Sequence, residues 1–144
     1  MDFSTKLAVV VNASVDVLKL IREVLEQSQI KTVFFFGPQL QSDASGFLAF
    51  VEAHKPDLVL FDVPMPYDEN LRLMSSLRQR AADQKFLVMT TSPDTVHSLI
   101  EAEPSLGEGI VDIVVGKPFN LDELLEAVQE GFSRSPKNVR VDGA

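Results

Sequence analysis

The sequence predicts an α/β fold in which a parallel sheet is covered by helices on both faces. Three observations lead to this prediction: five short apolar runs recur along the chain, each run is continuous rather than alternating, and segments with helical spacing separate the runs. Continuous apolar runs are typical of strands buried on both faces, as parallel strands between helices are. Strands and helices that alternate and are joined by right-handed crossovers form a doubly wound open sheet.

The expected strands are residues 7–11, 33–36, 58–61, 86–89 and 110–115. The first helix should begin after Ser14, whose hydroxyl suits an N-cap. Asp16 then lies in the first turn, where an acidic side chain is favoured by the helix dipole. The apolar face of this helix consists of residues at helical spacing, namely Val17, Leu18, Ile21 and Leu25.

The fourth and last helices have clear end signals of their own. Ser92 followed by Pro93 predicts an N-cap with proline at the first helical position, and Pro104 limits the far end. Asn120 with Glu123 three residues on predicts a capping box for the last helix. The apolar face of the last helix is formed by Leu121, Leu124, Leu125, Val128 and Phe132.

Length and composition favour one soluble domain. The chain has 144 residues, of which 45% are hydrophobic and 24% are charged, and it has no cysteine, so a core without disulfides is expected. Helical periodicity is lost near Phe132, so residues 1–132 should form the domain and residues 133–144 a tail. The formal net charge of −8 opposes binding to a nucleic acid backbone. No run resembles a signal peptide or a membrane span, so we expect a cytoplasmic protein.

Four strand ends carry the residues from which a functional site could be built. The first strand ends at Asn12 and Ala13, the third at Asp62, the fourth at Thr90 and the fifth at Lys117. In open α/β sheets, the carboxyl ends of the strands meet at the edge where ligands bind. An aspartate, a hydroxyl and an ammonium at this edge would suit phosphoryl chemistry, with the carboxylate as nucleophile and the ammonium offsetting the phosphoryl charge.

These residues and their neighbours resemble the receiver domain of two-component response regulators. The resemblance covers roughly residues 6–132, and its motifs are Lys55-Pro56-Asp57-Leu58-Val59-Leu60-Phe61-Asp62-Val63-Pro64-Met65-Pro66, then Thr90, then Lys117-Pro118-Phe119-Asn120-Leu121-Asp122-Glu123-Leu124-Leu125. It implies a flavodoxin-like (βα)5 sheet with strand order 2-1-3-4-5. It also implies that Asp62 accepts a phosphoryl group from a histidine kinase, that Thr90 moves to contact this group, and that Lys117 holds it.

The sequence departs from the family pattern at the metal site. Such receivers carry two adjacent acidic residues that help to bind Mg²⁺, and Asn12 and Ala13 stand at these positions. Mg²⁺ requires oxygen ligands in near-octahedral geometry. The remaining candidate ligands are Asp62, the backbone carbonyl of Pro64 and, weakly, the Asn12 amide oxygen, so Mg²⁺ binding should be weak. With Asp62 facing Lys117, the pocket would be formally neutral and could close as a salt bridge.

The output side departs from the pattern as well. Thr91 stands beside Thr90, where the family often has a smaller residue. Val114 stands where receivers often have an aromatic side chain that rotates inward. The segment between Thr90 and Lys117 is longer than is common, and residues 101–109 form an expected acidic loop beside the face that such domains use for partners.

Signal relay is therefore the expected function, and three hypotheses stay open. In the first, the chain is a divergent pseudo-receiver with Asp62 as the nominal phosphoacceptor, and partner binding depends little on Mg²⁺-driven phosphorylation. In the second, a histidine kinase still phosphorylates Asp62 at a reduced rate. The third hypothesis is a hydrolase with an aspartyl nucleophile. Such enzymes resemble one another in an Asp-x-Asp motif, and Pro64 stands here where that motif has its second aspartate.

The partners follow from the same expectations. A histidine kinase or another signalling protein should bind the chain, which is not expected to be an enzyme itself. The resemblance also implies dimerisation through the fourth helix and the fifth strand as an option. Neither a membrane nor direct contact with nucleic acid is expected.

Overall fold

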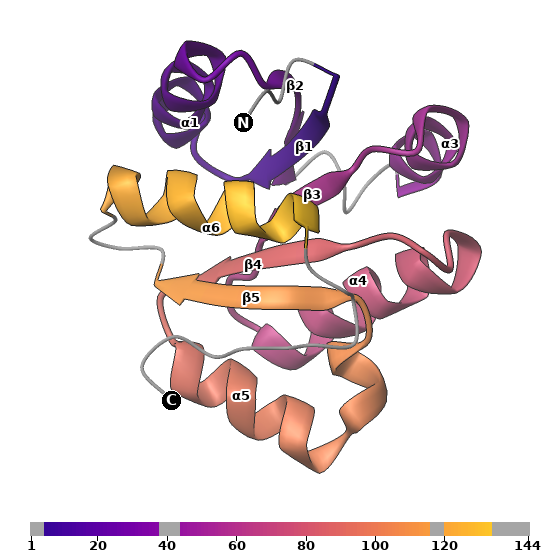
Figure 1. Ribbon diagram of the computed structural model, residues 1–144. Helices are drawn as coiled ribbons and strands as arrows, with labels where there is room; N and C mark the ends of the chain where they lie inside the picture. Colours follow the sequence, from indigo (N-terminus) through magenta and orange to yellow (C-terminus); the bar gives the residue numbers. More distant parts are fainter. Residues whose placement is uncertain (1–4, 38–43, 116–119, 134–144) are drawn as a thin grey trace.

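The computed structural model describes residues 5–37, 44–115 and 120–133 (Figure 1). The strands are β1 Leu7–Asn12, β2 Lys31–Phe36, β3 Leu58–Asp62, β4 Phe86–Thr90 and β5 Ile110–Val115. The helices are α1 Val15–Gln27, α3 Ala44–His54, α4 Tyr67–Arg80, α5 Pro93–Ala102 and α6 Leu121–Ser133, with a short 3₁₀ helix, η1, at Pro104–Gly107. All pairings are parallel and the order is β2-β1-β3-β4-β5. The predicted fold class and strand order are confirmed.

Two apolar layers hold the sheet between its helices. Successive side chains of a strand point to opposite faces, so each strand contributes to both layers. Val9 and Val59 pack in the layer beneath α3, α4 and α5, whereas Val10 and Leu60 pack in the layer beneath α1 and α6. Figure 1 shows α6 lying across one face of the sheet and α4 behind it. Burial on both faces is the reason why the apolar runs are continuous.

The N-terminal ends of α1 and α6 are capped by the predicted residues, Ser14 and Asn120, and the bonds to Asn120 form one half of the predicted capping box. The Ser14 hydroxyl accepts a hydrogen bond from the Val17 amide at 3.3 Å. The Asn120 side-chain oxygen accepts hydrogen bonds from the amides of Asp122 and Glu123 at 2.9 and 3.2 Å. These bonds satisfy amides that have no partner within the helix.

The N-terminus of α5 begins at the predicted place but is capped differently. Ser92 is the N-cap and Pro93 lies in the first turn, yet the Ser92 side chain makes no cap bond to the backbone. Its hydroxyl is hydrogen-bonded to Thr95 Oγ1 at 2.7 Å instead. Ser92 is thus a weaker cap than Ser14.

The expected acidic loop at residues 101–109 is largely helical, which corrects the sequence interpretation. Helix α5 continues to Ala102, and η1 follows almost at once. Leu106 in η1 is only 3% exposed and packs in the core, which explains why this segment folds back onto the domain. Arg72 of α4 forms an ion pair with Glu103 at 2.8 Å.

Some predicted features lie outside the described residues. Lys117 and residues 134–144 of the expected tail are among them. Val114 is described, is partly buried and packs against the layer beneath α1 and α6. Among the described helices, none has both the length and the apolar character needed to cross a bilayer.

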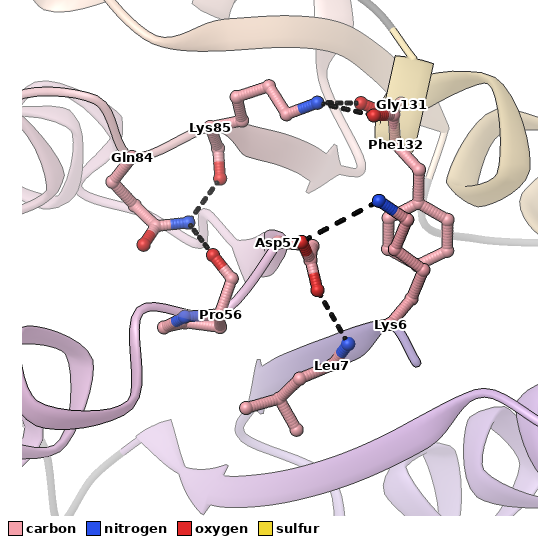
Figure 2. Close-up of polar contacts among 8 residues, drawn as sticks. All are labelled: Lys6, Leu7, Pro56, Asp57, Gln84, Lys85, Gly131 and Phe132. Atoms are coloured by element: carbon pink, nitrogen blue, oxygen red, sulfur yellow. Dashed lines mark hydrogen bonds and ion pairs between the residues drawn. The ribbon is translucent and has the colours of Figure 1, made fainter. Parts of the chain in front are cut away.

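Lys85 ties the start of β4 to the end of α6 (Figure 2). Its ammonium donates hydrogen bonds to the carbonyl oxygens of Gly131 and Phe132 at 2.7 and 2.8 Å, so it caps the C-terminal end of the helix. Burial, and after it the Lys6 ammonium, lowers the pKa of Lys85 from its ordinary value, whereas Asp57 acts in the opposite direction.

Two further side chains join the loops at this end of the sheet (Figure 2). Gln84 is 6% exposed and donates hydrogen bonds to the carbonyl oxygens of Pro56 and Lys85 at 3.1 and 3.0 Å. The Asp57 carboxylate accepts a hydrogen bond from the Leu7 amide at 2.8 Å. The amino ends of β1, β3 and β4 are therefore held by side chains.

Candidate functional site

A cavity of about 350 Å³ lies at the carboxyl ends of β1 and β3, where the sequence predicts the site. It is lined by Asn12, Ala13, Ser14, Val17, Asp62, Val63, Pro64, Met65, Tyr67, Met89 and Thr91. This end of a parallel sheet is where open α/β folds bind their ligands. The lining therefore brings together Asp62, Asn12 and Pro64, as predicted.

Asp62 is held at a defined point because β3 stays paired with β4 beyond it. Its Cα is in register with that of Met89, and the amide of the next residue, Val63, donates a hydrogen bond to the Met89 carbonyl at 2.8 Å. The Asp62 side chain is partly exposed at the cavity. A carboxylate in this place is accessible and fixed, as a nucleophile requires.

The two residues that replace the acidic pair lie in the cavity lining. Asn12 is 6% exposed, and its side-chain oxygen accepts a hydrogen bond from the Ser14 amide at 2.9 Å. Ala13 has no side-chain donor or acceptor. Asp16 is exposed in the first turn of α1 and does not line the cavity.

Asn70, which was not among the predicted site residues, fixes the loop after Asp62. This residue lies in α4, is 6% exposed, and donates hydrogen bonds from Nδ2 to the carbonyl oxygens of Pro64 and Pro66, both at 3.0 Å. A signal for it existed. Asn70 lies four residues before Met74, on the apolar face of α4, where a polar side chain needs a partner.

The two threonines at the end of β4 have different surroundings. Thr90 is completely buried, and its hydroxyl accepts a hydrogen bond from the Ser92 amide at 3.2 Å. Thr91 lines the cavity, and its hydroxyl lies 3.4 Å from the hydroxyl of Tyr67. The role of Thr90 as a mobile hydroxyl stays a prediction, and of the two threonines it is Thr91 that lines the cavity.

The described oxygen atoms do not fit Mg²⁺. The Asn12 oxygen is bonded to the Ser14 amide, the Pro64 carbonyl is bonded to Asn70, and Ala13 supplies no ligand. Within the described part of the chain, no three Asp, Glu or His side chains gather closely enough to hold a metal ion. Mg²⁺ is bound through carboxylates together with waters, and the described lining supplies one carboxylate, Asp62, with neutral oxygens beside it, so these residues fit the ion poorly.

A second cavity, of about 670 Å³, lies at the opposite end of the sheet between the ends of α3 and α4. Glu52 and Arg80 line it and form an ion pair at 3.0 Å. None of the residues predicted for the site lines this cavity. Its charged side chains include both signs, so it selects no class of ligand.

Comparison with known proteins identifies a family for this fold. Residues 8–129 match the family model of the response regulator receiver domain. Over 101 residues, the chain is 30% identical to the DNA-binding transcriptional regulator NtrC of Salmonella typhimurium. That match covers 67% of this chain and 20% of the relative, so the chain spans about a fifth of its length.

Solved structures are similar over most of the chain. A response regulator from Thermotoga maritima is 27% identical with a TM-score of 0.70, over 90% of this chain and 98% of the other. A CheY-like receiver domain protein from Methanospirillum hungatei has the same fold, with 20% identity and a TM-score of 0.69, over 89% of this chain and 94% of the other.

Proposed function

This chain belongs to the response regulator receiver domain family, and we propose that within two-component signalling it is a divergent pseudo-receiver that works as an interaction module. Asp62 is its nominal phosphoacceptor. Its binding to a histidine kinase or another signalling protein depends little on Mg²⁺-driven phosphorylation. One observation carries this proposal: the neutral side chains of Asn12 and Ala13 line the cavity beside Asp62, which is the single carboxylate among the described lining residues.

The physical reason lies in the charge of the phosphoryl group. Transfer to a carboxylate places a strongly anionic group beside other oxygens, and its transition state needs a cation to offset that charge. The side chain of Asn12 offers Mg²⁺ only a neutral oxygen beside Asp62, and the Pro64 carbonyl is neutral as well. Mg²⁺ is usually bound through carboxylates together with water and phosphate oxygens, so neutral oxygens offset less of its charge. The second acidic ligand is missing as well, because Ala13 replaces it.

The rim of the cavity supports binding to a protein. Met65 lines the cavity and is 75% exposed, and Val15, the first residue of α1 and the neighbour of the lining residue Ser14, is 54% exposed. Large apolar side chains at a cavity rim suit a partner that covers them. The net charge of −8 argues against direct binding to nucleic acid. A homodimer through α5 and β5 stays a prediction.

One observation favours a second candidate function, a receiver that is still phosphorylated at Asp62. The carboxylate is partly exposed at a cavity of about 350 Å³, which leaves space for a donor. In that case an Asp62 oxygen attacks the phosphorus while the bond to the histidine nitrogen of the kinase breaks. The partner would have to supply the electrostatic stabilisation that Asn12 and Ala13 do not.

Intact mass after incubation with acetyl phosphate separates the two functions. The chain, its Asp62→Asn variant and an Asn12→Asp/Ala13→Asp variant are compared with and without Mg²⁺. We expect no phosphoryl adduct on the wild-type chain under either condition, and a Mg²⁺-dependent adduct on the double variant, which is the positive control. A Mg²⁺-dependent adduct on the wild-type chain that Asp62→Asn abolishes would overturn the pseudo-receiver proposal in favour of the second function.

A further inference from the structure

The loop that carries Asp62 into α4 is fixed by one side chain of that helix. Asn70 donates hydrogen bonds from the same nitrogen to the carbonyl oxygens of Pro64 and Pro66, both at 3.0 Å. The Pro66 carbonyl also accepts the Asn70 backbone amide at 3.2 Å. The two donor hydrogens of Nδ2 thus join carbonyls two residues apart and hold the loop against the helix.

The position of Asn70 makes these bonds strong constraints. Its side chain is 6% exposed, beside Leu71 and Met74, which are fully buried. Inside a protein, an amide or carbonyl that loses its partner keeps the full cost of desolvation, so a buried bond of this kind is rarely open. The loop has few other ways to be held, because Pro64 and Pro66 have no amide hydrogen to donate.

We propose that Asn70 is a positioning residue for Asp62, and that its amide gives the loop the internal cross-link that a bound divalent cation would otherwise provide. The pocket then keeps its shape without metal. This inference rests on the proposed function, because it explains how a receiver whose oxygens do not fit Mg²⁺ still presents an ordered Asp62 to a partner.

The chain contains a matched control at the other end of the sheet. Gln84 is also 6% exposed and also donates from one amide nitrogen to two carbonyl oxygens, those of Pro56 and Lys85 (Figure 2). We call each side-chain amide with its two carbonyl partners a clamp. Near each clamp lies a backbone amide whose hydrogen exchange rate shows whether the clamp is intact. The Val63 amide bonds to the Met89 carbonyl near Asn70, and the Phe86 amide bonds to the Gly109 carbonyl near Gln84, both at 2.8 Å.

Amide hydrogen exchange in Asn70→Ala and Gln84→Ala tests the proposal. We compare the ratio of the exchange rate of the Val63 amide to that of the Phe86 amide. In Asn70→Ala, this ratio should rise about tenfold because Val63 exchanges faster, and in Gln84→Ala it should fall because Phe86 exchanges faster. The ratio cancels any general loss of stability, because global unfolding exposes both amides. If the ratio in Asn70→Ala stays at the wild-type value, Asn70 is an ordinary buried amide and the proposal is overturned.

The wild-type chain provides two readouts that need no variant. The side-chain amide hydrogens of Asn70 should exchange about tenfold more slowly than those of the exposed Asn120. Adding millimolar Mg²⁺ should leave the exchange ratio of Val63 to Phe86 unchanged. Fast exchange at Asn70, or selective protection of Val63 by Mg²⁺, would overturn the proposal. These readouts follow the loop and not the phosphoryl group, so a failure of the proposed function, which the mass experiment detects, is recognised separately.

Discussion

Restoring the acidic pair should create a Mg²⁺ response that the natural sequence lacks. The register places Val11 beside Phe61, so Asn12 and Asp62, one position further on, end neighbouring strands. Neighbouring strands lie about 4.8 Å apart. Asn12→Asp keeps an oxygen for the Ser14 amide, and Ala13→Asp adds the missing carboxylate, so the double variant changes charge with little change in shape.

The magnitude follows from the spacing. Two like charges about 5 Å apart repel by about 3 kcal/mol at an effective dielectric constant near 20, and by about 1 kcal/mol in water. Without Mg²⁺, each close pair of carboxylates in the double variant should therefore cost about 1–3 kcal/mol of its free energy of unfolding. A cation present at ten times its dissociation constant should raise the free energy of unfolding of the double variant by about 1.4 kcal/mol, which corresponds to roughly 5 °C in Tm for a domain of this size.

Thermal unfolding with and without Mg²⁺ measures this response. K⁺ at equal ionic strength controls for screening, and adding Asp62→Asn to the double variant should remove the response because a third carboxylate is lost. The wild-type Tm should change by less than about 1 °C. A wild-type shift as large as that of the double variant would refute the reasoning, because a single carboxylate would then be enough to bind the cation.

Three further predictions concern the rest of the fold. The pKa of Lys85 is lowered from its ordinary 10.5, so between the lowered pKa and 10.5 the unfolded chain binds more protons than the folded chain. In this pH range, the free energy of unfolding of the wild-type chain should therefore rise with pH relative to that of Lys85→Met, and below the lowered pKa the difference should not change with pH. Urea unfolding of both proteins at several pH values measures this. Ser14→Ala should cost about 1 kcal/mol in the same assay and Ser92→Ala a few tenths, since only Ser14 caps a backbone amide; equal losses would contradict this. Gly109→Ala should lower the free energy of unfolding by about 1–3 kcal/mol, because φ is +85° and the new Cβ would lie 2.7 Å from Arg78 Cδ. Gly37→Ala should change it by less than about 0.5 kcal/mol, because the atom nearest to its new Cβ lies at 3.5 Å. A Tm for Gly109→Ala no lower than that for Gly37→Ala would contradict this.

The strands could be predicted because burial on both faces leaves a direct mark on the sequence. The limits of this signal are visible in β2, which begins at Lys31 and not at Val33. Lys31 is exposed but pairs with Leu7, and pairing of an exposed residue at the edge of a sheet leaves no apolar mark. The same argument applies to residues 101–109. Their charge predicted a loop, yet one buried leucine, Leu106, directs the fold of this segment.

The site could be predicted in part. Strand ends placed Asp62, Asn12 and Pro64 correctly at one edge. Alternation along β4 could not have distinguished the two threonines, because the strand ends at Thr90 and Thr91 lies beyond it, yet Thr91 is the one that lines the cavity. The clamp made by Asn70 could not be derived, because it depends on the direction of two backbone carbonyls, and spacing in the sequence carries no information about these.

The hydrogen bonds of Lys85 have a mechanical consequence. Strand β4 runs from Phe86, next to Lys85, to Thr90 at the candidate site, a length of roughly 17 Å. An extended strand inside a sheet is stiff along its axis, since each residue is bonded to both neighbours. A displacement of Thr90 along that axis therefore pulls on the ammonium that holds the last carbonyls of α6. The hydrogen bonds of Lys85 therefore connect the strand that ends beside the candidate site to the C-terminal end of α6.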